Sequence, residues 1–365
     1  MNPSGMRMGM VGVVSLGLST LAATAQAANW ADKTLINGFM SAVYSKTNED
    51  LFFNGDATEA GINNDGSFQG TRYGLNIRSQ VSDRVTLASQ FIGSIKDQNY
   101  AAHVDWAFIG LKLNDEFTLR AGKIKYPVGL VNEYVAVGNA FPWISPPVLF
   151  YGTNQNGPQA TREAYTGASL LWGDESGDWS LSSDLFGGEV DLDGGMKIKS
   201  LVGLSVGGEW NDMLAIKAST YKGTMKFDDP TIGLGPMMDG KTHKASTLGA
   251  KLEWDDLIAY TEYAKVTMGM VNMMGMPVNN GNSKTYYMTL GYHLGDWLPH
   301  VTYQNWSRDN GNGNQITTLG LRYDVDPATS VKLEVSNIAT DNKGIFDGTP
   351  TGDVSMYSLA VDVVF

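Results

Sequence analysis

Apolar and polar residues alternate along this chain in segments of about ten residues, and this period constrains the fold more than any other feature. The C-terminal segment is the clearest case, because one face carries Tyr357, Leu359, Val361, Val363 and Phe365. The same alternation appears in segments 72–81, 315–323 and 330–335. Successive side chains of a β-strand point to opposite faces, so each segment predicts a strand with one apolar and one polar face.

The connections between these segments fall into two length classes. Short polar turns such as Ser82–Arg84 and Asn114–Glu116 alternate with longer stretches rich in Gly, Asn and Asp. The predicted long loops cover residues 46–69, 94–103, 124–160, 187–198, 223–244, 268–282, 309–313 and 340–352. A soluble sheet can also alternate, but strict alternation of loop lengths is typical of a membrane barrel. The sequence therefore predicts an all-β fold, a transmembrane antiparallel β-barrel of about 16 strands with both termini on the turn side.

Aromatic residues near the predicted strand ends favour a membrane location. They are Trp106, Phe117, Trp172, Trp179, Trp210, Trp254, Trp297 and Tyr323. Amphipathic rings are stable at the level of lipid headgroups, so we expect two interfacial girdles. Ordinary strand aromatics are the alternative interpretation.

The composition excludes several classes of function. The chain has 365 residues, a formal net charge of −12 and no cysteine. The acidic excess argues against binding to nucleic acid through bulk charge, and the lack of cysteine excludes disulfides and thiolate sites. The four histidines show no metal-ligand spacing, and no phosphate-binding loop or hydrolase nucleophile motif is present. We therefore expect no cofactor, no bound metal and no enzymatic activity.

The N-terminus has the pattern of a secretory signal peptide. Arg7 is followed by an apolar run from Met8 to Leu21, and Ala25-Gln26-Ala27 has the small-x-small form of a cleavage site. We expect residues 1–27 to be a cleaved signal peptide and residues 28–365 to form a single barrel. A transmembrane anchor is the alternative, but it needs about 20 apolar residues without the Gly and Ser interruptions seen here.

Two stretches resemble a known family. The first is the terminal strand that ends in Phe365, and the second is Leu119–Leu130 (LRAGKIKYPVGL). Both are similar to the trimeric porins of Gram-negative outer membranes, and the second resembles the strand leading into their long third loop, including that of the phosphate- and anion-preferring branch. The resemblance implies a homotrimer in the outer membrane, reached through the periplasm, with short periplasmic turns and long extracellular loops. It also implies passive diffusion of small ions and hydrophilic solutes, and that Phe365 is the barrel assembly signal.

Residues 124–160 form the longest predicted loop. The loop carries the aromatic residues Tyr134, Phe141, Trp143, Phe150 and Tyr151. Rings of this kind favour burial, and the resemblance implies that the loop folds into the lumen as a constriction. The alternative is a loop packed on the barrel rim or against a neighbouring subunit.

Charged residues near this loop are candidates for the pore lining. The basic ones are Arg72, Arg78, Arg120, Lys123 and Lys125. We expect the arginines to line one wall of the constriction, with Glu133 on the loop side, so that opposed charges create a transverse field. The alternative is that these charges form local ion pairs, for example with Asp83 or Asp105. The basic cluster favours a slight preference for anions.

Other functions remain open at this stage. A solute-specific channel would use the aromatic residues between 134 and 151 as a stacking track for sugars. A non-conducting structural or adhesive barrel would share the same strand pattern. A barrel enzyme is disfavoured, because His293 and His300 flank the Gly295-Asp296 turn rather than an outer-leaflet site.

Overall fold

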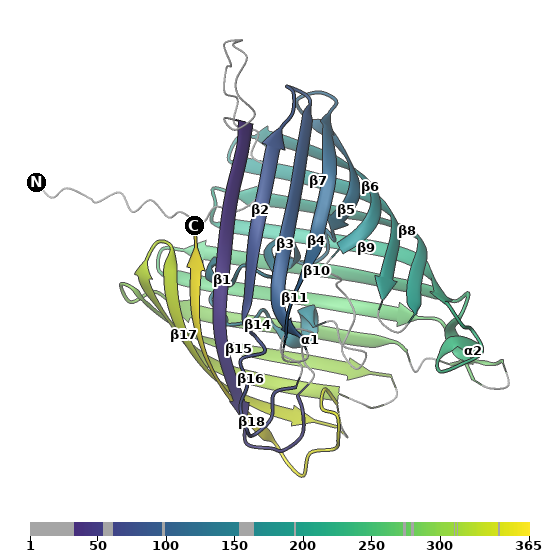
Figure 1. The fold of residues 1–365 in the computed structure, drawn as a ribbon, viewed down its shortest axis with the longest axis vertical. Coiled ribbons are helices and arrows are strands. Elements are labelled where there is room, and N and C mark those ends of the chain that lie inside the picture. Colours follow the sequence, from purple (N-terminus) through teal and green to yellow (C-terminus); the bar gives the residue numbers. More distant parts are fainter. Residues whose placement is uncertain are drawn as a thin grey trace, which may run out of the picture.

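The chain forms one closed antiparallel barrel. The computed structural model describes residues 33–365, except 54–60, 97–98, 153–163, 193–194, 273–274, 279–280, 310, 312 and 342–343. Its sixteen barrel strands each pair with their neighbours in chain order, and β18 pairs with β1 to close the sheet (Figure 1). The fold class predicted from the sequence is therefore confirmed, whereas the predicted signal peptide, 1–27, lies outside the described residues.

The elements have the following bounds. The first eight barrel strands are β1 (Thr34–Thr47), β2 (Arg72–Gln80), β3 (Val85–Lys96), β4 (Asn99–Lys112), β5 (Phe117–Lys125), β6 (Ala164–Ser176), β7 (Trp179–Leu192) and β8 (Met196–Trp210). The other eight are β9 (Leu214–Phe227), β10 (Thr242–Trp254), β11 (Leu257–Met268), β14 (Ser283–Tyr292), β15 (Trp297–Arg308), β16 (Gly313–Asp326), β17 (Thr329–Thr340) and β18 (Val354–Val364). The connections carry η2 (Asn132–Tyr134), η3 (Gly138–Ala140), α1 (Val148–Tyr151), α2 (Gly235–Met238) and a small ribbon of β12 (Met270–Val271) and β13 (Pro277–Val278).

Alternate residues point into and out of the barrel, as the sequence pattern predicts. On β18, Tyr357 and Leu359 are 52% and 43% exposed, whereas Ser358 between them is buried. Ser358 faces inward and shares a hydrogen bond with Ser45 of β1, at 2.8 Å between the two hydroxyl oxygens. The apolar face of the sheet is therefore on the outside, which is the arrangement of a barrel surrounded by lipid.

Two predicted loops are largely strand. Residues 94–103 lie mostly in β3 and β4, which are separated by two residues, and residues 187–198 lie mostly in β7 and β8, which are separated by three. The sequence prediction of a long loop is wrong at both places. The small residues Ala101-Ala102 and Gly187-Gly188 do not alternate between apolar and polar, so the sequence gives no strand signal there. A register shift also interrupts the pairing of β3 with β4 and of β7 with β8.

The aromatic girdle lies at the turn side of the barrel. Trp179, Trp254 and Trp297 are exposed on the outer face at the turn-side ends of their strands. Trp106 does not belong to this girdle, because it pairs in register with inward-facing Gln90 and so points into the barrel. No helix in the described part of the chain has the length and apolar character needed to cross a membrane.

The barrel interior is packed on one side by the segment between β5 and β6. We call its described part, residues 126–152, the lumen loop. Most of its residues are buried, and they join the inward side chains of many strands in apolar clusters. The helix α1 at its end lies within the ring of strands, against β14 and β15 (Figure 1). The prediction that the loop enters the lumen therefore agrees with its described part.

Candidate channel site: the lumen loop and the facing wall

Three cations of the barrel wall bind the backbone of the lumen loop. Lys332 on β17 donates from Nζ to the carbonyl oxygens of Gly138 at 2.6 Å, Phe141 at 2.9 Å and Trp143 at 2.7 Å. Its ammonium also lies 2.9 Å from the Asp362 carboxylate on β18. Irregular loops leave carbonyls without partners, and buried carbonyls must be hydrogen-bonded. Lys332 meets that need at the centre of the loop.

Two arginines extend this attachment along the same stretch of loop. Arg322 on β16 donates to the carbonyls of Asn139 and Phe141, both at 2.9 Å. Arg72 on β2 donates from Nε to the Ala136 carbonyl at 2.9 Å and from Nη2 to the Ile144 carbonyl at 3.2 Å. The loop is thus fixed to strands on both sides of the β1–β18 seam.

A buried carboxylate holds both ends of the lumen loop. Glu262 on β11 accepts a hydrogen bond from the Leu130 backbone N–H at 2.8 Å and another from the Tyr151 hydroxyl. Tyr287 on β14 donates to the same carboxylate at 2.7 Å. Burial raises the pKa of Tyr151, and the Glu262 carboxylate adds to the effect. Tyr151 therefore stays protonated and remains a donor.

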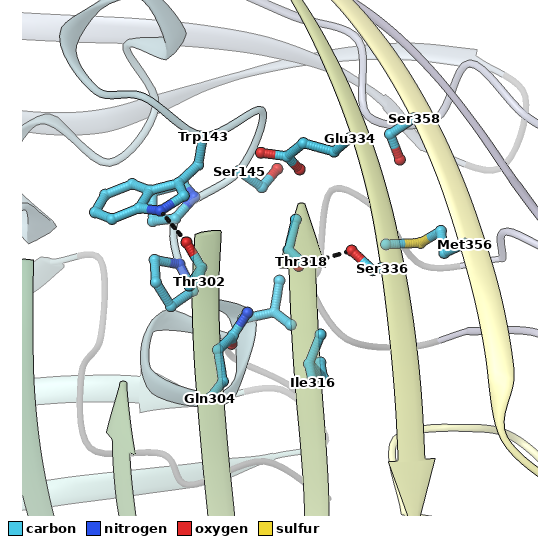
Figure 2. Close-up of a pocket in the computed structure, with 13 residues that line it drawn as sticks. Trp143, Ser145, Thr302, Gln304, Ile316, Thr318, Glu334, Ser336, Met356 and Ser358 are labelled. Carbon is cyan, nitrogen blue, oxygen red and sulfur yellow. Dashed lines mark hydrogen bonds between the residues drawn. The ribbon is translucent and has the colours of Figure 1, made fainter. Parts of the chain in front are cut away.

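Hydroxyl groups of the wall bind the Trp143 indole, which packs deep in the lumen. Its Nε1 donates to Thr289 at 3.0 Å and to Thr302 at 2.9 Å. Figure 2 shows the indole turned toward Thr302, with Glu334 and Ser145 beside it. The cavity there has a volume of about 30 Å³. That volume holds one or two water molecules and is too small for a solute to pass.

Reasoning from the sequence missed these anchoring residues. Lys332, Glu334 and Arg322 fall on the polar face of predicted strands, but their partners are backbone groups of the loop more than 180 residues away. Lys332 and Arg322 donate to loop carbonyls, and Glu334 accepts from the Ile144 N–H. The available signal was a charged residue at an inward position of the barrel, where an unpaired charge is costly.

The predicted lining residues Arg120 and Lys125 face partners of opposite charge. Arg120 on β5 is buried, forms an ion pair with Asp184 on β7 and donates to the Ser169 hydroxyl at 3.0 Å. Lys125 lies 2.9 Å from Asp105 on β4. The alternative interpretation, that these charges form local ion pairs, therefore describes Arg120 and Lys125, and Asp105 is the predicted partner of Lys125. Their charges are locally compensated.

The other predicted residues differ in position. Arg78 faces inward on β2, is exposed, and has no ionic or hydrogen-bonding partner within the described part of the chain. Lys123 pairs with Ala107 and so lies on the face of β5 opposite to Arg120. Its Nζ donates to the Val104 carbonyl at 2.7 Å, and its pore-lining role stays a prediction. Glu133, on η2, lies 3.8 Å from Lys217 of β9 rather than opposite the arginines.

The barrel wall falls into two parts that differ in accessibility. On β14–β18 nearly all inward side chains are buried beneath the lumen loop. On β2–β8, which we call the facing wall, many inward side chains such as Arg120 and Phe186 are also buried, but others are accessible at three levels. His103 is exposed at the loop end, Trp106 and Phe108 are half-buried in the middle, and Ser182 is exposed at the turn end. Solvent therefore reaches the facing wall from both ends of the barrel.

The aromatic residues predicted as a sugar track are mostly inaccessible. Phe141, Trp143, Phe150 and Tyr151 are buried between the loop and β14–β18. Only Tyr134 among the five is partly exposed. Burial also raises the pKa of Tyr134, with Glu262 contributing, so its hydroxyl stays protonated. The described residues contain no group of three or more acidic or histidine side chains arranged to bind a metal ion.

Comparison with known proteins identifies the fold. No family model and no curated protein sequence matches the chain. Three solved structures that resemble it are OmpF of Salmonella typhi in complex with daunomycin, an anion-selective porin from Comamonas acidovorans, and the outer membrane channel DcaP of Acinetobacter baumannii. They have TM-scores of 0.61, 0.59 and 0.60 and sequence identities of 13%, 11% and 11%. The alignments cover 92%, 91% and 91% of this chain and 99%, 99% and 97% of theirs. The closed 16-stranded barrel is therefore the fold found in outer-membrane porins.

Proposed function

We propose that this chain is an outer-membrane channel through which small hydrophilic solutes and ions diffuse passively. The observation that carries the proposal is the difference between the two parts of the wall. The lumen loop covers most inward side chains of β14–β18, whereas on the facing wall Arg78, His103 and Ser182 are exposed and Trp106 and Phe108 are only half-buried. A barrel of 16 strands is wide enough for an aqueous lumen, so a loop packed on one side narrows it without filling it.

The outer surface supports the membrane location. Exposed outward residues are mainly apolar, and the tryptophans at the turn side are placed where a headgroup interface would stabilise them. Export through the periplasm, with removal of residues 1–27, and assembly into a homotrimer belong to the same proposal. Removal of residues 1–27 rests on the signal-peptide pattern of the N-terminus, and the homotrimer rests on the resemblance of the sequence to trimeric porins. The turn side is then periplasmic and the loop side extracellular.

Ion preference depends on the charges that remain uncompensated. Arg120 and Lys125 have acidic partners, and Arg72 is engaged by loop carbonyls. Arg78 is accessible and has no partner in the described residues, so it acts on passing ions most directly. A fixed guanidinium charge in a narrow lumen attracts anions, which supports a slight anion preference.

Planar-bilayer recording of the purified protein tests the proposal. Stepwise conductance in potassium chloride is expected. Replacing chloride by the larger gluconate should lower the current more than replacing potassium by the larger Tris cation does. A protein that inserts stably but never conducts would instead be a structural barrel, and the proposed function would be wrong.

A solute-specific channel is a second candidate, favoured by one observation. Trp106 and Phe108 lie on the facing wall with their ring centroids 5.6 Å apart, both partly exposed. Aromatic faces of this kind can stack on sugar rings. Maltose and longer maltooligosaccharides should then block single-channel current at millimolar concentration, whereas a general diffusion channel shows no saturable block.

A further inference from the structure

Four lysines form a row on the outer surface of the barrel. Lys222, Lys244, Lys265 and Lys284 lie on the neighbouring strands β9, β10, β11 and β14, and all four are exposed. The register places Lys222 directly opposite Lys244 and Lys265 directly opposite Lys284. Ser246 on β10 pairs with Lys265, so the two lysine pairs are diagonal neighbours. We call this set the lysine row.

The lysine row lacks the acidic partners that other outer lysines have. On β8 and β9, Lys197 also lies directly opposite Lys226. That pair is compensated, because Lys197 is 3.4 Å from Asp228 and Lys226 is 3.2 Å from Asp239. No residue in the described ranges forms an ion pair or hydrogen bond with a lysine side chain of the row.

Like charges directly opposite each other on a sheet are destabilising, since their Cα atoms are about 4.5–5.5 Å apart. The two lysines of each pair repel each other, and the two neighbouring pairs also repel each other. An anion bound between the lysines would relieve this repulsion.

The position of the row along the strands indicates where that anion comes from. Lys244 precedes the exposed Trp254 of the turn-side girdle by ten residues on β10. At about 3.3 Å per residue and a tilt of about 40°, the separation along the barrel axis is roughly 25 Å, the height of the apolar band of such barrels. Between them the outward residues of these strands include Leu248, Tyr263 and Met288, which are 56%, 43% and 48% exposed. The row thus lies at the opposite headgroup level.

We propose that the lysine row binds the phosphate groups of a lipid in the leaflet on the loop side, with a headgroup that carries two phosphates. Four strands about 4.8 Å apart spread the ammonium groups over roughly 15 Å, which a single phosphate does not span. Lysine ammonium groups suit phosphate oxygens, and basic clusters at headgroup level attract anionic lipids. This inference rests on the membrane location proposed above.

Lipid titration of the purified protein in mild detergent, read by native mass spectrometry, tests the proposal. The probes are diphosphoryl lipid A, monophosphoryl lipid A and phosphatidylcholine. Diphosphoryl lipid A should bind most tightly. The variant K222Q/K244Q/K265Q/K284Q should lose about tenfold or more in affinity for it, because four lysine contacts are removed. Equal affinity of this variant and the unaltered protein would overturn the proposal.

Two comparisons make the outcome specific. K197Q/K226Q is the matched control, since it removes an opposed lysine pair that already has acidic partners, and it should keep the affinity. Millimolar inorganic phosphate should not displace the lipid; displacement would show a site for free anions and contradict the lipid assignment. Because the row is outside the lumen, the quadruple variant should conduct normally in bilayers. If the unaltered protein conducts but does not prefer diphosphoryl lipid A, only this inference is overturned. If the protein fails to insert into bilayers, the proposed membrane location is overturned.

Discussion

Individual charged residues inside the barrel have different tasks, although they look alike in the sequence. Arg72 and Arg78 on β2 and Arg120 on β5 all occupy inward positions. Arg72 donates to loop carbonyls, Arg120 pairs with Asp184, and Arg78 is accessible. Only a charge that is both accessible and uncompensated exerts a field on a passing ion. Burial and pairing therefore determine which arginine influences transport.

Replacing Arg78 by alanine should shift ion preference toward cations. The expected change is a measurable shift of the reversal potential in a salt gradient, because one uncompensated positive charge leaves the lumen. R120A should shift it less, because Arg120 and Asp184 are both buried away from passing ions, and K123A, on the opposite face of β5, should leave it unchanged. A larger shift in K123A than in R78A would contradict the assignment of these faces.

Replacing Glu262 by glutamine should loosen the lumen loop. The carboxylate accepts three hydrogen bonds, two of them from the loop, and hydrogen bonds to a charged group contribute about 1.5–3 kcal/mol. Amide hydrogen exchange of residues 126–152 should become roughly ten- to a hundredfold faster if that energy is lost. E189Q, which alters a partly exposed ion pair on β7, is the control. Unchanged exchange in E262Q would show that Glu262 does not anchor the loop.

At the scale of elements, the sequence predicted what local alternation specifies. The strands with strong contrast, such as β2 and β18, were predicted in the correct place and on the correct face. The extensions of β4 and β7 were missed, because Ala101-Ala102 and Gly187-Gly188 are as compatible with loop as with strand. Pairing with neighbouring strands determines their conformation, and that information is not local.

The attachment of the lumen loop could be predicted only in part. The aromatic content of the loop indicated burial, and most of residues 126–152 are buried, whereas its entry into the lumen was implied only by the resemblance. Which wall it covers depends on contacts such as those of Lys332 and Glu262, which join segments far apart in the chain. No periodic signal in one sequence records such pairs. For the same reason the sequence did not reveal that Phe141 and Trp143, offered as part of a stacking track, are buried.

Replacing residues 131–149 by a short Gly-Ser linker should widen the channel. The loop takes no part in the barrel ladder, so strand pairing should persist, while conductance should rise about twofold or more toward that of an unobstructed barrel. A similar replacement of residues 229–238, which include α2 in the β9–β10 connection, is the control and should leave conductance unchanged. Loss of the folded barrel in the first variant alone would show that the loop is needed for stability rather than for constriction.

At the scale of the whole molecule, closure of the barrel depends on the seam between its first and last strands. Phe365 follows β18 and exchanges two backbone hydrogen bonds with Gly38 of β1, both at 2.9 Å. Its ring covers Gly38, where any side chain would collide with it. A membrane barrel has no free edge, so this last pairing completes the backbone hydrogen bonding.

The variant F365A separates two roles of Phe365, closure of the barrel and recognition of the chain during its assembly into the membrane. It keeps the two backbone bonds to Gly38, so refolding of the purified protein into detergent should be close to that of the unaltered chain. If Phe365 is the assembly signal, the yield of folded barrel in cells should fall strongly, as judged by heat-dependent migration in gel electrophoresis. V364A, at the neighbouring position, should fold normally in both settings. Normal cellular assembly of F365A would contradict the assembly role.

The central claim is that water fills the space beside the facing wall and not the space behind the lumen loop. The chain has no cysteine, so single cysteines can report on this directly. R78C and T302C place a thiol on the facing wall and beneath the loop, and a charged methanethiosulfonate reagent is added during bilayer recording. The account predicts rapid modification and a fall in current for R78C, with no effect for T302C. Block through T302C with R78C unaffected, or no current from either, would contradict it.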